Sequence, residues 1–129
     1  MTITTPLAVA DDRVHVLIVD DSADQLLLLR TYFERSGCDV EVASTAEEAI
    51  ATYGSLDPDL AVIDLVLPGM DGWTLASRMT VDKPDCVIAI TSVLDAEDYP
   101  AGHITLPKPV TRAHVQQVLR DSVPKWVEG

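Results

Sequence analysis

The sequence predicts one α/β domain whose parallel sheet is covered by helices on both faces. Short apolar runs rich in β-branched residues alternate along the chain with segments of helical character. Because parallel strands need long crossover connections, this alternation is typical of strands joined by right-handed helical crossovers. The chain has 129 residues, of which 47% are hydrophobic and 23% charged. This length and balance fit a single globular domain rather than a disordered chain.

Five apolar runs are the predicted strands. The first reads Val-His-Val-Leu-Ile-Val and ends in two aspartates, a pattern typical of a strand buried on both faces. The expected strands cover 14–19, 39–43, 60–63, 87–90 and 104–106.

Capping residues mark the predicted helices between these strands. Ser22 or Asp24 can cap the first helix at about 23–35, which Gly37 ends. Thr45-Ala-Glu-Glu is a capping box for a helix that reaches about Tyr53. The remaining helices are expected at about 73–80 and from a Thr111 cap to near Pro124.

The charge of the chain excludes several classes of partner. Nine basic and 21 acidic residues give a net charge of −12, whereas nucleic acids and anionic membranes select basic surfaces. The first ten residues lack a signal-peptide pattern, and no apolar run is long enough for a membrane span. Cys38 and Cys86 are expected to be free thiols in the cytoplasm. We expect 1–12 to be a flexible lead-in and 13–129 to form the domain.

Polar residues stand at the carboxyl ends of four of the predicted strands. They are Asp20, Asp21, Asp64, Thr91, Ser92 and Lys108. Since the carboxyl ends of parallel strands form the ligand-binding edge of such a sheet, we expect these side chains to meet there. Three carboxylates in one crevice repel one another and require a cation or a raised pKa. Oxygen ligands without cysteine or histidine favour Mg²⁺, with Asp20 and Asp21 as its ligands.

The same residues indicate phosphoryl transfer. Asp64 stands alone at the end of the central predicted strand, so we interpret it as a carboxylate nucleophile that forms an acyl phosphate. Lys108 would pair with a phosphoryl oxygen. Taken singly, Asp20 and Asp21 could merely cap the first helix, and Asp64 could be a solvated strand end. The agreement among several elements favours the common site.

Several motifs together resemble the receiver domain of bacterial two-component response regulators. They are Asp20-Asp21, Asp64, the Leu-Pro-Gly-Met-Asp-Gly segment at 67–72, Thr91 and Lys108-Pro109. The resemblance extends over roughly 14–122 and implies a flavodoxin-like fold with five parallel strands in the order 2-1-3-4-5. It implies a single-domain response regulator, which is a phosphoacceptor that assists its own phosphorylation and dephosphorylation rather than an enzyme.

The resemblance also implies residue roles and partners. Asp64 would take the phosphoryl group from a phosphohistidine on a histidine kinase or a histidine phosphotransfer protein, in a reaction that depends on Mg²⁺. Thr91 would be the switch hydroxyl, and Lys108 would bind the phosphoryl group beside a cis bond to Pro109. The metal site would comprise Asp20, Asp21, Asp64 and the backbone carbonyl of Val66.

The stretch between Thr91 and Lys108 departs from the family pattern. It is short, acidic and interrupted by Pro100 and Gly102, so we expect the fourth helix of the fold to be shortened or missing. Thr105 occupies the position where receivers often carry an aromatic switch residue. Both changes fall on the surface through which many receivers dimerise or signal. Because only 124–129 follow the last predicted helix, we expect output through protein–protein contact with an unknown downstream partner. The alternatives are a phosphate relay or sink, or a piece of a longer protein.

Four successive leucines, 26–29, lie in the first predicted helix. Helical residues turn by about 100° each, so these four cannot all face the sheet. We expect Leu26, Leu29 and Phe33 to face the core, with Leu27 or Leu28 toward the rim. The run is either a wide buried face or an exposed patch for a partner helix, and the resemblance favours the patch.

Two other functions fit parts of the sequence. The altered stretch before Lys108 would suit a receiver-like interaction module that works without phosphorylation. A small phosphatase with an aspartate nucleophile would need a second acid two residues after Asp64, where Val66 stands.

Overall fold

Five parallel strands form one sheet in the order β2-β1-β3-β4-β5, in a computed structural model that describes residues 13–92 and 104–127. The strands are β1 (His15–Val19), β2 (Asp39–Ala43), β3 (Leu60–Asp64), β4 (Val87–Ser92) and β5 (Ile104–Pro107). The predicted fold class and strand order are confirmed. Both β3 and β4 extend past their apolar runs because the strand pairing continues through Asp64 and Thr91.

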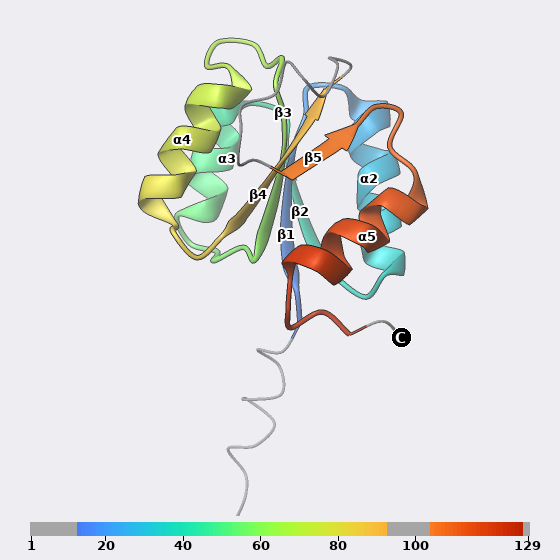
Figure 1. Ribbon diagram of the computed structural model, residues 1–129. Helices are drawn as coiled ribbons and strands as arrows, with labels where there is room; N and C mark the ends of the chain where they lie inside the picture. The colour runs from blue at the N-terminus through green and yellow to red at the C-terminus, as the bar shows by residue number, and fades with distance from the viewer. Residues whose placement is uncertain (1–12, 93–103, 128–129) are drawn as a thin grey trace, which may run out of the picture.

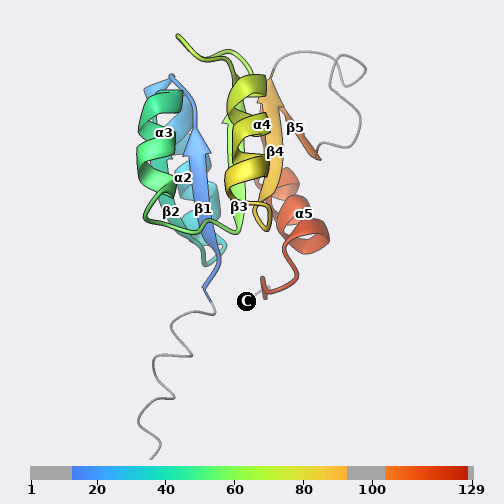
Figure 2. The ribbon, with the colours of Figure 1, turned by 90° about the vertical axis from the view of Figure 1, so that its left-hand side faces the viewer.

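Helices cover both faces of this sheet, as Figures 1 and 2 show. The four described helices are α2 (Ala23–Arg35), α3 (Ala46–Tyr53), α4 (Gly72–Asp82) and α5 (Arg112–Ser122). Helices α3 and α4 lie on one face, and α2 and α5 on the other. The expectations of a shortened or missing fourth helix, at 93–103, and of a flexible lead-in, at 1–12, lie outside the described residues.

Each described helix begins with a side-chain cap. Ser22, Thr45, Asp71 and Thr111 each accept a hydrogen bond from the backbone N–H three residues further on. These bonds satisfy one of the donors that a helix start leaves unpaired. The Asp71 cap starts α4 at Gly72, one residue before the predicted start, because Asp71 lies in a segment that reads as a loop.

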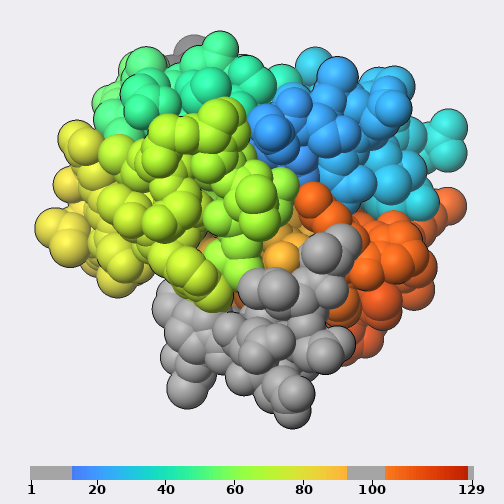
Figure 3. Space-filling model, turned by 90° about the horizontal axis from the view of Figure 1, so that it is seen from above, coloured from blue at the N-terminus to red at the C-terminus, as the bar shows by residue number. Residues whose placement is uncertain are grey.

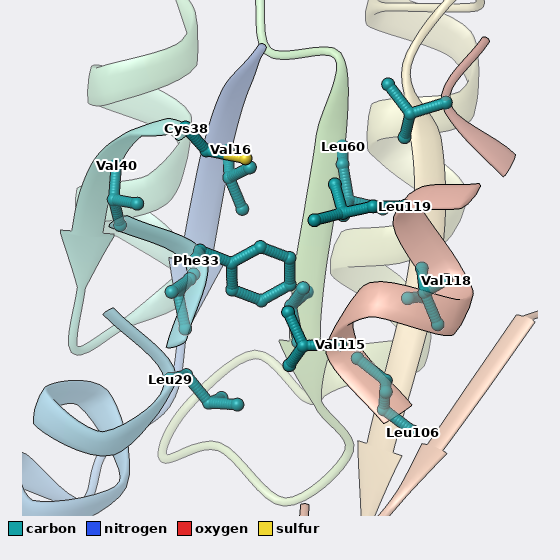
Figure 4. Packing of buried hydrophobic residues seen from close by; sticks show 14 of the residues in the cluster. Val16, Leu29, Phe33, Cys38, Val40, Leu60, Leu106, Val115, Val118 and Leu119 are labelled. Atoms are coloured by element: carbon teal, nitrogen blue, oxygen red, sulfur yellow. The ribbon is translucent and has the colours of Figure 1, made fainter. Parts of the chain in front are cut away.

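Two apolar clusters, one on each face, hold the helices to the sheet. Figure 4 shows the cluster beneath α2 and α5, in which Leu29 and Phe33 from α2 are fully buried together with Val115 and Leu119 from α5. Burial of such side chains stabilises the fold by about 1.5–3 kcal/mol each. The predicted core stripe of α2 is confirmed, with Leu26 partly buried against the same cluster.

The other two leucines of the run stay at the surface. Leu27 is 65% exposed and Leu28 is 37% exposed. Both therefore lie outside the core, whereas the sequence predicted this for one or the other. Cys38 and Cys86 are free and buried, as expected, and burial raises the pKa of their thiols to about 11 and about 12. No described helix has both the length and the apolar character that crossing a bilayer requires.

Candidate phosphoacceptor site

The candidate site lies at the carboxyl edge of the sheet, where the central strands end together. Asp20 directly follows β1, Asp64 ends β3, and Lys108 directly follows β5. Asp64 pairs in register with Thr91 on β4. The segments after β1, β3 and β5, coloured blue, green and orange, converge on the face seen in Figure 3. Topology alone thus gathers residues that lie far apart in the sequence.

Lys108 bridges two buried carboxylates. Its Nζ lies 3.3 Å from Asp20 Oδ2 and 3.3 Å from Asp64 Oδ2. Asp20 is fully buried and Asp64 is 5% exposed, whereas Asp21 is exposed at the rim. One oxygen from each of the three aspartates lies within 4.8 Å of the others. Three carboxylates therefore lie close together, and Lys108 pairs with the two buried ones.

Backbone amides fix how the two buried carboxylates point. The N–H of Ser22 donates to Asp20 Oδ1 at 2.9 Å, and the N–H of Val66 donates to Asp64 Oδ1 at 3.1 Å. Each aspartate is therefore anchored through one oxygen to the residue two positions later, and its other oxygen faces Lys108. This arrangement sets the carboxylates in place before any ligand binds.

The charges of the site shift two pKa values upward. Burial raises the pKa of Asp20, and the nearby charge of Asp64 adds to the effect, against the hydrogen bond from Ser22 and the attraction of Lys108. Burial by itself would lower the pKa of Lys108, but the charges of Asp20 and Asp64 outweigh it and raise that pKa. Lys108 is therefore protonated at neutral pH, and ionised Asp20 is costly without a further cation.

Thr91 places a buried hydroxyl at the edge of the site. The residue is fully buried, and its Oγ1 has no hydrogen-bond partner within the part of the chain that the structure describes. A buried hydroxyl without a partner costs free energy, on the order of 1–3 kcal/mol. Because Thr91 stands beside Asp64 in the strand register, its hydroxyl is suited to a partner that arrives with a ligand.

The three carboxylates fit a hard divalent cation. All the donors in this cluster are oxygens, which is the ligand type of Mg²⁺. Asp20 Oδ2 is buried and makes no hydrogen bond to any described residue, although it lies within ion-pair distance of Lys108. The acidic cluster of Asp20, Asp21 and Asp64 is the arrangement typical of a receiver metal site.

The structure brings the predicted acids, Thr91 and Lys108 together at one edge of the sheet. The chemical roles of these residues remain predictions. The backbone amide of Val66 contacts Asp64, whereas a role for its carbonyl in metal binding stays a prediction. The bond between Lys108 and Pro109 is cis, as the resemblance implied. Sequence reasoning missed the close approach of Gly72 to the Asp64 backbone, since a glycine in a loop gives no sign of which atoms it contacts.

Comparison with known proteins agrees with this geometry. The family model for the response regulator receiver domain matches residues 16–120. The chain is 31% identical over 120 residues to the transcription factor SKN7 of Saccharomyces cerevisiae, covering 85% of this chain and 19% of that protein. It is 37% identical over 82 residues to the alkaline phosphatase synthesis transcriptional regulatory protein PhoP of Bacillus subtilis, covering 64% of this chain and 34% of that protein. The chain thus spans only a fifth to a third of the length of these relatives.

Solved structures share the fold closely. The CheX–CheY–BeF3–Mg²⁺ complex from Borrelia burgdorferi matches with a TM-score of 0.76 and 29% identity, covering 83% of this chain and 87% of that chain. A CheY-like receiver domain protein from Methanospirillum hungatei JF-1 matches with a TM-score of 0.79 and 25% identity, covering 88% of this chain and 96% of that chain.

Proposed function

Because the chain belongs to the response regulator receiver domain family, a family of phosphoacceptor signalling modules rather than classical enzymes, we propose that it takes a phosphoryl group onto Asp64. The observation that carries this proposal is the placement of Asp64. Its carboxylate is almost fully buried at the end of the central strand and lies 3.3 Å from Lys108 Nζ. It neighbours Thr91, whose hydroxyl has no hydrogen-bond partner in the described part of the chain.

The donor is a phosphohistidine on a histidine kinase or a histidine phosphotransfer protein. A carboxylate oxygen of Asp64 forms a bond to phosphorus while the bond from phosphorus to the histidine nitrogen breaks. The imidazole leaves with the electron pair of that bond, and the product is an acyl phosphate on Asp64. The reaction is a displacement at phosphorus, so the protein contributes mainly positioning and charge stabilisation.

Mg²⁺ is the cofactor that fits the acidic cluster. Asp20, Asp21 and Asp64 would hold the ion together with the backbone carbonyl of Val66. When bound, the ion neutralises charge on the phosphoryl oxygens. The Mg²⁺ in the Borrelia burgdorferi complex supports this assignment, as does the buried Asp20 oxygen that makes no hydrogen bond within residues 13–92 and 104–127.

Lys108 and Thr91 stabilise the phosphorylated state. The Lys108 ammonium can pair with a phosphoryl oxygen in place of one of its two carboxylates, which strengthens charge stabilisation where negative charge develops. The Thr91 hydroxyl can donate to another phosphoryl oxygen and so gain the partner that it lacks among the described residues. A movement of Thr91 toward the phosphoryl group would carry the signal into β4.

Protein–protein contact provides both input and output. The exposed Leu27 and Leu28 on α2 form an apolar patch suited to a helix of the kinase or phosphotransfer protein. The downstream partner binds the phosphorylated form, and the whole exchange takes place in the cytoplasm. The Borrelia burgdorferi relative was solved in complex with CheX, which supports a protein partner for this chain.

Incubation with Mg²⁺ and acetyl phosphate tests the proposal. Intact-mass spectrometry should find one phosphoryl group on the wild type, and none on Asp64→Asn or on the wild type in excess EDTA. The absence of any adduct on the wild type would overturn the phosphoacceptor function. If the affinity for a protein partner is the same with and without beryllofluoride, and the same in Asp64→Asn, the result would favour a phosphorylation-independent interaction module instead.

A further inference from the structure

We infer that Gly72 is a positioning residue that sets the distance between Asp64 and the rest of the site, an inference that rests on the proposed function. Gly72 is the first residue of α4. A Cβ built at this position would lie 2.2 Å from the backbone oxygen of Asp64, 2.7 Å from Leu65 Cα and 2.9 Å from the backbone carbon of Asp64. All three atoms belong to the main chain, so no rotamer change could make room.

The requirement at Gly72 is for space and not for an unusual backbone conformation. Gly69, in the same loop, has a φ of +77°, and its nearest neighbour would be the Glu47 carboxylate at 3.8 Å. Gly69 therefore supplies the left-handed conformation that the turn needs. Gly72 has no positive φ, so a side chain there acts only by pushing the start of α4 and the end of β3 apart.

Two backbone hydrogen bonds connect this contact to the rest of the site. The N–H of Gly72 donates to the Leu65 carbonyl at 3.0 Å, and the N–H of Leu65 donates to the Thr91 carbonyl at 3.2 Å. These two bonds close the loop 65–72 where the start of α4 meets the end of β3, a contact that we call the neck. The second bond also holds the end of β3 against β4. Widening the neck moves Asp64 and disturbs its register with Thr91.

The other charged groups of the site are held independently of this neck. Asp20 follows β1 and Lys108 follows β5, so a displacement of Asp64 at the end of β3 does not carry the backbone of either residue with it. The two 3.3 Å separations from Lys108 would then become unequal. A misplacement of about 1 Å at a reacting group can cost on the order of 10²-fold in rate.

Gly72→Ala tests this inference beside two matched controls. Gly54→Ala changes a glycine at the end of α3, where a Cβ would be at ordinary contact distances of 3.5 and 3.6 Å from its nearest neighbours. Asp71→Ala removes the cap of α4, which accepts from the Thr74 N–H at 2.8 Å, and weakens the same helix end without adding bulk. Trimethylamine N-oxide, which favours the folded state, is added equally to all samples, and circular dichroism confirms folding.

Two readouts decide the outcome. The rate constant for phosphorylation by acetyl phosphate at saturating Mg²⁺ should fall on the order of 10²-fold in Gly72→Ala and stay within about twofold in both controls. The amide NMR shifts of Asp64, Leu65 and Thr91 should move in Gly72→Ala alone. A normal rate in Gly72→Ala, or an equal loss in Asp71→Ala, would overturn the inference. If the wild type accepts no phosphoryl group, the proposed function fails, and the amide shifts alone then decide whether Gly72 positions Asp64.

Discussion

The two edges of the sheet use aspartate in opposite ways. At the amino edge three aspartates each pair with a different cation: Asp39 lies 2.9 Å from Arg13, Asp57 lies 2.5 Å from Lys83, and Asp59 lies 3.1 Å from Lys125. At the carboxyl edge Asp20, Asp21 and Asp64 cluster together, and among the described residues Lys108 is the cation that pairs with two of them, Asp20 and Asp64.

Burial accompanies this difference in charge balance. The amino-edge pairs are open to solvent, with Asp57 89% exposed, so each contributes only about 0–1 kcal/mol to stability. At the carboxyl edge Asp20 and Asp64 are buried, Asp21 is exposed, and the negative charge exceeds that of Lys108. This excess costs the folded state free energy until a cation binds. The proposed site thus lies at the edge where the charges do not balance, and substitutions at the two edges should have different effects.

The largest contrast is expected in metal binding. Asp20→Asn should lower the affinity for Mg²⁺ by at least about tenfold, a loss that even residues outside the first ligand shell can cause. Asp59→Asn removes the same charge from the amino edge and should leave the affinity unchanged. Isothermal titration calorimetry of both variants measures this directly. Equal losses in the two variants would mean that net charge, and not the acidic cluster, attracts the ion.

The stability of the metal-free protein should depend on pH through Asp20. Burial raises the pKa of Asp20 above its ordinary value of 3.8, so over the range above 3.8 the folded chain binds more protons at this site than the unfolded chain. The contribution of Asp20 to stability therefore falls as pH rises. Asp20→Asn lacks this penalty and should be more stable than the wild type at neutral pH by about 1 kcal/mol, the scale of a screened like-charge repulsion.

Urea unfolding without Mg²⁺ at a series of pH values measures this difference. The stability advantage of Asp20→Asn over the wild type should grow from acid toward neutral pH. It should shrink when Mg²⁺ is added, because the ion stabilises ionised Asp20. A difference that is constant with pH would show that Asp20 does not carry the penalty.

An effect of similar size, but of opposite sign and independent of the site, is expected for the C-terminal segment at the amino edge. Trp126 packs against the cluster under α2 and α5, and its Nε1–H donates to the Ser36 carbonyl at 2.8 Å. Trp126→Phe keeps most of the packing and removes that bond, so it should lower the free energy of unfolding by about 1 kcal/mol. Phosphorylation of Asp64 should be unaffected, and a slower reaction would indicate that the two edges are coupled.

The smallest effect is expected for the amino-edge ion pair between Lys125 and Asp59. Lys125→Met should change the free energy of unfolding by no more than about 1 kcal/mol. Salt should reduce the difference further, since both side chains reach solvent. Urea unfolding at low and high ionic strength provides the measurement, and a large, salt-independent loss would show that the amino edge is more than a set of surface pairs.

Local signals predicted most of the fold. Helix α2 occupies the predicted residues because Ser22 caps it and Gly37, at a φ of +90°, follows its end. The apolar runs predict that β3 and β4 end before Asp64 and Thr91, because these residues are polar. In the structure both strands are longer, since strand pairing continues through both residues. Pairing of this kind depends on a neighbouring strand and not on the residue itself.

The site was predictable as a set of residues but not as a geometry. The acids, Thr91 and Lys108 could be grouped because the carboxyl ends of parallel strands meet at one edge. The two equal separations from Lys108, the Thr91 hydroxyl without a partner among the described residues, and the close approach of Gly72 all depend on how separate elements pack. Only the packed fold defines them.

The most direct test of the account is to identify which carboxylate carries the phosphoryl group. The protein is phosphorylated with acetyl phosphate and Mg²⁺, the acyl phosphate is reduced with borohydride to homoserine, and peptide sequencing by mass spectrometry locates the change. The account predicts homoserine at position 64 alone. Homoserine at position 20 or 21, at an amino-edge aspartate, or at no position would contradict it.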